Sequence, residues 1–305
     1  MSASRLRSAH RAFRQECLTH PTILALCRNP SAVAGGVVVT ALAVLAIVGP
    51  FVTPYDPTTQ HLENQLQAPS LAHPLGTDQL GRDVATRVVY GARLTLGIAL
   101  LVTVVRLTIG VVVGLVAGYV GGWVDEALMR VVDVLLAFPG IVLALVVAGI
   151  LGPSLTNLVL ALAVVGWTRY ARVVRSSVLE VRERPFVAAS RLTGASRWRV
   201  VRRHVLPNVA GPVVVLATLD LGGVILAAAG LSFLGLGAQP PAPEWGTMLA
   251  TGRHHLREAS WLVNAPGLAI VFAVLGSNLL GDGLRDALDP TDRTGDARTE
   301  VARRD

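Results

Sequence analysis

The residues most suited to chemistry in this sequence form a dense run of arginines in its second half. Ten arginines lie between Arg169 and Arg203, and the only acids in that stretch are Glu180 and Glu183. Guanidinium groups pair with carboxylates and phosphates through bidentate hydrogen bonds. The stretch is therefore suited to contact an acidic protein surface, a nucleic acid or the headgroups of anionic lipids.

Backbone signals inside this stretch predict a helix, a turn and a second helix. Helix-compatible spacing covers residues 178–193 and is interrupted at Pro185. Gly194 follows, and a glycine after a helix adopts a left-handed backbone without a steric penalty. Ser196 can then cap a second short helix that extends through Val205. This shape fits a DNA-reading motif as well as a membrane-protein loop that docks onto a soluble partner, and the flanking sequence decides between them.

The composition of the chain is that of a membrane protein. Of its 305 residues, 52% are hydrophobic and 15% are charged, whereas a soluble domain carries about 25% charged residues. A transmembrane helix needs about 20 mostly apolar residues to cross about 30 Å of hydrocarbon. We therefore predict an all-α membrane protein with six transmembrane helices, at residues 33–52, 94–117, 131–151, 155–174, 209–229 and 261–280.

The arginines also orient these helices, because cytoplasmic segments of membrane proteins carry an excess of positive charge. Arginines at positions 5, 7, 11, 14 and 28 precede the first helix and predict a cytoplasmic N-terminus. Alternation then places the arginine-rich loop and the C-terminus in the cytoplasm, and the segments 53–93 and 230–260 outside. A loop tethered to the bilayer at both ends could hardly enter a DNA groove, so nucleic acid is not an expected partner.

The sequence also excludes several activities. All 27 of its Lys and Arg residues are arginines, so the chain has no Walker A lysine and cannot hydrolyse ATP through a P-loop of its own. No constellation of His, Asp, Ser or Cys typical of an active site lies within the predicted helices, and we expect no catalytic residue. Cys17 and Cys27 are the only cysteines and are predicted to be free thiols in a reducing compartment.

Ala188-Ala189-Ser190, Gly194 and Val205-Leu206-Pro207 follow one another in the arginine-rich loop. This arrangement resembles the short cytoplasmic motif of bacterial ABC-importer permeases. In that motif Glu-Ala-Ala is followed by a glycine, and later by a hydrophobic residue before Leu-Pro. Here Ala188 stands where the family often has glutamate, so no ion pair is expected at that position. The residues that the resemblance implies in ATPase coupling are Ala188, Ala189, Ser190, Gly194, Ala195, Ser196, Arg197, Arg199, Leu206 and Pro207. Arg202 and Arg203 are further candidates for pairing with ATPase carboxylates or lipid headgroups.

Other stretches, in the same order along the chain, resemble the "C" type permease subunit of the dipeptide/oligopeptide/nickel branch of this family. They cover residues 73–83, 118–125, 130–139, 231–246 and 281–290. The resemblance implies a type I ABC-importer permease with a MetI-like fold and cytoplasmic coupling helices. It also implies a sister permease, two ATPase subunits that hold ATP and Mg, and an extracytoplasmic binding protein, with the lipid bilayer around them and no cofactor on this chain.

The expected organisation follows from these boundaries. A cytoplasmic tail covers residues 1–32, and the first helix with an extracytoplasmic segment covers 33–93. A five-helix core covers 94–283 and contains the coupling loop at 172–207, and a cytoplasmic tail covers 284–305. The implied function is a translocation path for peptides, with nickel chelates or glutathione as alternatives. A secondary transporter is another class, but it would need inverted repeats, of which the sequence shows no clear sign.

Arg106 and Asp220 fall near the middles of two predicted helices, where each charge costs about 2.5–3.5 kcal/mol and needs a partner or water. We predict that they pair or that both line the translocation path, although one of them could instead reach the membrane surface. Pro139 and Pro212 are expected to kink their helices, and Pro139 is a further candidate for the path.

Several other residues are candidates for packing or docking. Glycines at positions 97, 110, 114 and 118 have near-helical spacing and are expected to permit close helix packing. Arg82, Asp83 and Trp245 are candidates for docking the binding protein, or alternatively for bracing the outer segments from within. His73, His254 and His255 lack a third ligand at recognisable spacing, so no metal site is predicted.

Overall fold

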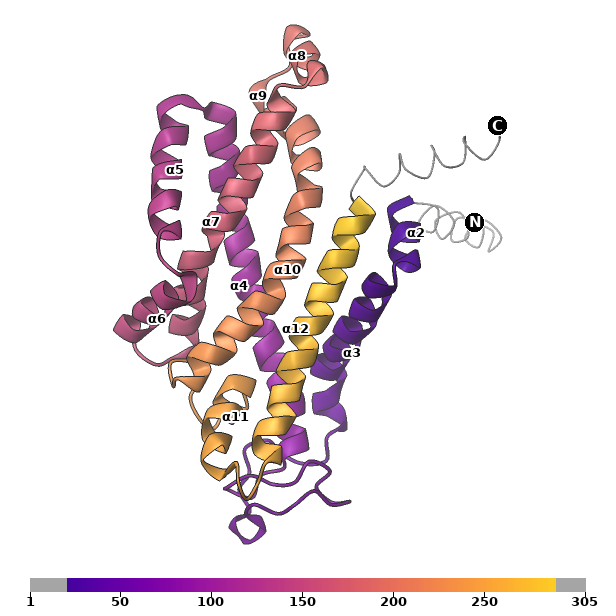
Figure 1. Cartoon of the computed structure of the whole chain (residues 1–305), viewed down its shortest axis with the longest axis vertical. Helices are drawn as coiled ribbons and strands as arrows, with labels where there is room; N and C mark the ends of the chain where they lie inside the picture. The colour runs from indigo at the N-terminus through magenta and orange to yellow at the C-terminus, as the bar shows by residue number, and fades with distance from the viewer. Residues whose placement is uncertain (1–20, 289–305) are drawn as a thin grey trace, which may run out of the picture.

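The protein, described here by a computed structural model for residues 21–288, is a bundle of long helices (Figure 1). Within these residues five helices are long and apolar enough to cross a membrane, and a bent helix pair supplies a sixth candidate. The long helices are α3 (Pro30–Val52), α4 (Val84–Val120), α7 (Leu155–Arg182), α10 (Leu206–Phe233) and α12 (Trp261–Leu288). Cys17 and the four arginines that precede it lie outside the described residues.

Short elements gather at the two ends of the bundle. At one end lie α2 (Pro21–Arg28), α8 (Pro185–Leu192) and α9 (Arg197–Val200), the last followed by the π-helical turn η2 (Val201–Val205). At the opposite end lie η1 (Leu62–Asn64), α11 (Trp245–Gly252) and η3 (Arg253–His255) (Figure 1). The chain thus alternates between the two ends in the order that the sequence predicts.

The third predicted transmembrane helix, residues 131–151, is not one helix. It is divided into α5 (Gly122–Leu136) and α6 (Gly140–Leu151), whose axes differ by 86°. Pro139 explains the break, because proline has no N–H for the helix ladder and disfavours helical backbone at the residue before it. Proline alone does not decide the outcome, since Pro212 lies within the unbroken α10.

The second long helix begins ten residues earlier than predicted, at Val84 rather than at residue 94. Asp83 caps it by accepting a hydrogen bond from the Thr86 amide at 2.7 Å. At 1.5 Å per residue α4 is about 55 Å long, which exceeds the hydrocarbon thickness of about 30 Å. Its first turns therefore extend beyond the hydrocarbon and belong to the folded end of the molecule.

Glycines bring α4 and α7 into close contact. A Cβ on Gly114 would lie 2.6 Å from the Ala171 carbonyl oxygen, and one on Gly118 would lie 2.8 Å from the Val178 Cβ. Gly110 faces Tyr170 in the same way. The predicted packing role is confirmed for these three positions. It is wrong for Gly97, where an added Cβ would meet nothing within 4 Å.

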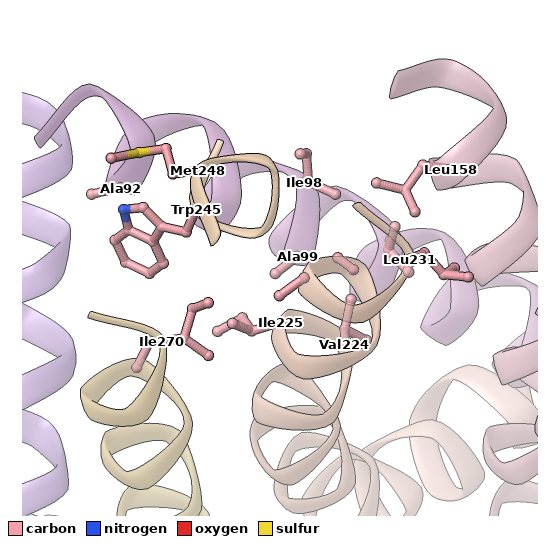
Figure 2. Packing of buried hydrophobic residues seen from close by; sticks show 14 of the residues in the cluster. Ala92, Ile98, Ala99, Leu158, Val224, Ile225, Leu231, Trp245, Met248 and Ile270 are labelled. Atoms are coloured by element: carbon pink, nitrogen blue, oxygen red, sulfur yellow. The ribbon is translucent and has the colours of Figure 1, made fainter. Parts of the chain in front are cut away.

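Two apolar clusters hold the bundle together. The larger lies toward α11, where Trp245 and Met248 pack near Ala92 of α4, Ile225 of α10 and Ile270 of α12 (Figure 2). The second, which we call the valine cluster, lies at the opposite end. Its buried members are Val174, Val178, Val181, Val187, Val200, Val205, Val209 and Val213. The bundle is therefore anchored by apolar packing at both ends.

Candidate functional site

The coupling loop has the predicted helix-turn-helix shape and projects from one end of the bundle (Figure 1). After α8, Gly194 adopts a φ of +82°, and the Ala195 amide donates to the Ser190 carbonyl at 3.2 Å. Ser196 caps the second helix by accepting from the Arg199 amide at 3.4 Å. The second helix is shorter than predicted, because its last five residues form the wider turn η2.

The valine cluster fixes this loop to the long helices. Val187 of α8, Val200 of α9 and Val205 of η2 are fully buried. They pack with Val174 and Val178, both on α7, and with valines of α10. Burying a valine side chain contributes about 1.5–3 kcal/mol, so the loop is held as a rigid extension of α7 and α10.

The opposite face of the loop is exposed and partly apolar. Leu192 is 89% exposed and Trp198 is 69% exposed. Phe186 is also exposed, and its ring lies at a tilt to that of His204, with 5.6 Å between the ring centroids. Around them the predicted coupling residues Ala188, Ala189, Ser196, Arg199 and Pro207 are exposed, whereas Ser190, Ala195 and Leu206 are half-buried. Arg197 begins α9, and its side chain lies outside the described part of the structure. Large apolar side chains exposed near each other in sequence, among polar residues, are candidates for contact with a protein partner.

Within the bundle, Arg106 of α4 and Asp220 of α10 form the predicted ion pair. The Arg106 Nη1 donates to both carboxylate oxygens of Asp220, at 3.2 and 3.1 Å. Its Nε donates to the Leu162 carbonyl at 2.9 Å, and the Tyr170 hydroxyl donates to Asp220 at 3.1 Å. Both charged side chains are about nine-tenths buried, so the pair joins α4, α7 and α10 through the interior.

Gly166 of α7 makes room for this arrangement. A Cβ at that position would collide with the Arg106 guanidinium. A guanidinium can therefore lie against the α7 backbone and reach the Leu162 carbonyl only because this residue lacks a side chain. Sequence spacing gave no signal for the role of Gly166.

A cavity of about 450 Å³ lies beside the ion pair. Its lining includes the three predicted path residues Arg106, Asp220 and Pro139, and also Arg169 and Thr168 of α7. The bend between α5 and α6 brings Pro139 to this place. In the sequence Arg169 opens the arginine-rich stretch, and no local pattern distinguishes it as a residue of the cavity.

The three candidates for docking a binding protein are corrected by the structure. Arg82, Asp83 and Trp245 are 4%, 4% and 0% exposed. Arg82 pairs with Asp78 at 2.7 Å, Asp83 caps α4, and the Trp245 indole donates to the Val88 carbonyl at 2.9 Å. Their side chains are buried in contacts within the chain, so these residues brace the outer segments and are not accessible for docking.

The histidines are also engaged locally. The His73 Nδ1 lies 2.9 Å from the Asp83 carboxylate, and the His73 ring contacts that of Tyr55 at a tilt. The His255 Nδ1 lies 2.6 Å from the Glu258 carboxylate. Nearby, hydrogen bonds from the hydroxyl and amide of Thr58 lower the pKa of Asp56. Among residues 21–288, no group of three or more His, Cys, Asp or Glu side chains is placed to hold a metal ion.

Comparison with known proteins identifies two matching family models. Residues 110–293 match the binding-protein-dependent transport system inner membrane component, and residues 21–69 match the N-terminal transmembrane domain of oligopeptide transport permease C. One solved structure, titled as inward-facing conformations of the MetNI methionine ABC transporter, aligns with a TM-score of 0.54 and 21% identity. The alignment covers 66% of this chain and 96% of that chain. The type I importer permease fold predicted from sequence is confirmed.

Curated relatives extend the match over most of the chain. A dipeptide transport system permease of Escherichia coli K12 is 48% identical over 86% of this chain and 90% of its own. A dipeptide permease of Alkalihalophilus pseudofirmus is 45% identical over 87% of each chain. A di/tripeptide permease of Pseudomonas aeruginosa is 44% identical over 86% of this chain and 88% of its own. This chain therefore belongs to the family of binding-protein-dependent transport system inner membrane components, in the branch of dipeptide and oligopeptide permeases.

Proposed function

We propose that this chain and a sister permease form the path by which an ABC importer moves dipeptides or tripeptides across a bacterial cell membrane. A binding protein delivers the peptide from outside, and two separate ATPase subunits bind and hydrolyse ATP with Mg. The observation that carries the proposal is the coupling loop. Its base is packed against α7 and α10 in the valine cluster, and Leu192 and Trp198 are exposed on it. The peptide class is supported by the names of the relatives, which are 44–48% identical.

The loop supplies what a coupling element needs. Its base is buried in the valine cluster, so a force on its exposed face is passed to α7 and α10 rather than absorbed by the loop. The exposed apolar side chains of the loop would fit an apolar cleft on a partner. The exposed Arg199 and Arg202 would pair with carboxylates beside that cleft. The chain has no lysine for a P-loop, which is consistent with nucleotide binding on other subunits.

The proposal also fixes an orientation. The coupling loop, α2 and the end of α12 lie at one end of the bundle (Figure 1). We place that end in the cytoplasm, because Arg28 precedes α3 and the loop is rich in arginine. The opposite end, which carries η1, α11 and η3, then faces outward and receives the binding protein.

The docking of the ATPases can be tested with single substitutions in the loop. Trp198→Ala and Leu192→Asp should abolish or strongly reduce co-purification of the two ATPase subunits with the permeases. Trp123→Ala is the matched control, because Trp123 is 79% exposed but lies on α5 outside the loop. If both loop variants retained the ATPases as well as the control does, the loop would not be the docking element.

The substrate class needs a separate assay. A strain that lacks the endogenous peptide importers, complemented with the complete set of subunits, should accumulate labelled dipeptides and not labelled nickel. Accumulation of nickel chelates without peptides would refute the proposed substrate class while leaving the permease role intact.

A further inference from the structure

We propose that the cavity beside the ion pair binds the carboxylate end of a peptide in transit, and that Arg169 is the residue that receives it. This inference rests on the proposed function, because it names the part of the peptide that the path recognises. The cavity lies among α4, α6, α7 and α10, and its volume of about 450 Å³ falls in the range of about 300–1,000 Å³ typical of small-ligand sites.

The first support comes from the hydrogen bonds and ion pairs that the arginines of α7 make. Arg172 pairs with Asp133 at 2.7 Å, Arg175 pairs with Asp125 at 2.6 Å, and Arg182 donates to the Gly118 carbonyl at 3.1 Å. Arg169 lines the cavity and is exposed, yet it makes no hydrogen bond or ion pair with any residue from 21 to 288. Among these four arginines of one helix, the one that faces the cavity is the one without a partner.

The second support is the balance of charge around the cavity. Asp220 is fully engaged, since it accepts hydrogen bonds from Arg106 and from Tyr170. Arg106 is engaged through Nε and Nη1, whereas its Nη2 donates to no group in the described structure. The ion pair is neutral as a unit, so Arg169 leaves the cavity with one uncompensated positive charge. A charge within a transmembrane helix is costly unless it meets water or a counter-charge.

The third support is the start of α6. Gly140 and Ile141 line the cavity, and Pro139 precedes them without a side-chain hydrogen bond to cap the helix. The amides of a first helical turn have no partner within the helix, and the helix dipole adds partial positive charge there. The uncompensated charge of Arg169 and these amides thus favour one anion. In an importer of peptides the anion common to every substrate is the terminal carboxylate, whatever the side chains.

The test uses the assembled importer in proteoliposomes, with its binding protein outside and labelled dialanine as substrate. Arg169→Gln should lower the maximal rate of uptake about tenfold, because a hydrogen-bonded charge pair of this kind contributes roughly that factor or more. Arg130→Gln is the matched control. Arg130 lies on α5 outside the cavity lining, and its pair with Glu126 is about three-quarters exposed, so its loss should leave uptake near the wild-type rate.

Charge rescue separates binding of the carboxylate from a structural role. Arg169→Cys would be made with Cys17→Ser and Cys27→Ser and labelled with a methanethiosulfonate reagent. An aminoethyl adduct, which is cationic, should restore most of the uptake, and a sulfonatoethyl adduct, which is anionic, should not. The same complex with arginine at position 169 receives both reagents as the control for labelling of the other subunits.

Each result decides the inference. Wild-type uptake by Arg169→Gln, or equal rescue by both adducts, would overturn it. Loss of the sister permease from purified Arg169→Gln complexes would also overturn it, because Arg169 would then pair with that subunit. Failure of the wild-type complex to import dialanine would refute the proposed function itself, and is thereby distinguished from failure of the inference alone.

Discussion

The ion pair between Arg106 and Asp220 should be a measurable source of stability in the folded bundle. Replacing Asp220 with asparagine keeps the shape of the side chain and removes its charge. Arg106 then retains the Leu162 carbonyl but loses its counter-charge, in a position that is about nine-tenths buried. Removing one member of a buried pair is far more harmful than removing both, because the remaining charge stays without compensation.

The expected magnitude follows from the contacts. Asp220 accepts two hydrogen bonds from Arg106 and one from Tyr170. Loss of one partner from a buried pair destabilises by about 3–5 kcal/mol. Polar interactions measured within membranes are weaker, averaging about 0.6 and reaching about 1.7 kcal/mol. We therefore expect a loss of about 2 kcal/mol for Asp220→Asn, and about 1 kcal/mol for Tyr170→Phe.

The assay is a double-mutant cycle on the purified permease complex, with the free energy of unfolding measured by titration with a denaturing detergent. Arg106→Met and Asp220→Leu should each destabilise, and the double variant should recover part of the loss because no buried charge remains. A coupling energy of about 1–2 kcal/mol is expected. Single effects that add within about 0.5 kcal/mol would show that the two residues do not stabilise each other, and would refute the reasoning.

Three further predictions follow from the glycines and from the folded outer end. Gly194→Val should abolish uptake while the protein still inserts, because a φ of +82° costs a side-chain-bearing residue about 1–2 kcal/mol and reshapes the coupling loop; normal uptake at normal expression would contradict this. Gly114→Leu should lower the melting temperature of the purified complex by separating α4 from α7, at a cost of about 1–3 kcal/mol, whereas Gly97→Leu should be tolerated. Trp245→Ala should destabilise by about 3–5 kcal/mol in the same assay, and a smaller effect than that of Gly97→Leu would contradict its place in the core.

The sequence predicted the features that depend on local chemistry. Apolar length located the long helices, and the preference of glycine for a left-handed backbone located the turn at Gly194. Opposite charges at similar depth predicted the pairing of Arg106 with Asp220, since burial leaves a charge few alternatives. Small residues at near-helical spacing predicted close packing of α4, but they did not indicate that its neighbour is α7.

The features that the sequence missed depend on contacts between distant segments. Hydropathy averages over residues 131–151 and cannot tell a straight helix from one bent by 86°, because both are equally apolar. Arg82 and Asp83 lie in a polar segment after an apolar helix, and this position predicts that they are accessible. In the structure Arg82 instead pairs with Asp78, and Asp83 caps the start of α4. Burial of this kind is set by tertiary packing, which no local pattern reports.

One helix connects the two candidate sites. Beside the cavity, Leu162 of α7 accepts a hydrogen bond from Arg106. From there α7 continues without a break to Arg182, and the valine cluster then fixes α8 and α9 to it. Closely packed interiors transmit displacement rather than absorb it. A shift of the coupling loop therefore moves α7 and α10 together relative to α4. Because Arg106 comes from α4 and Asp220 from α10, such a shift changes the contacts of this pair beside the cavity.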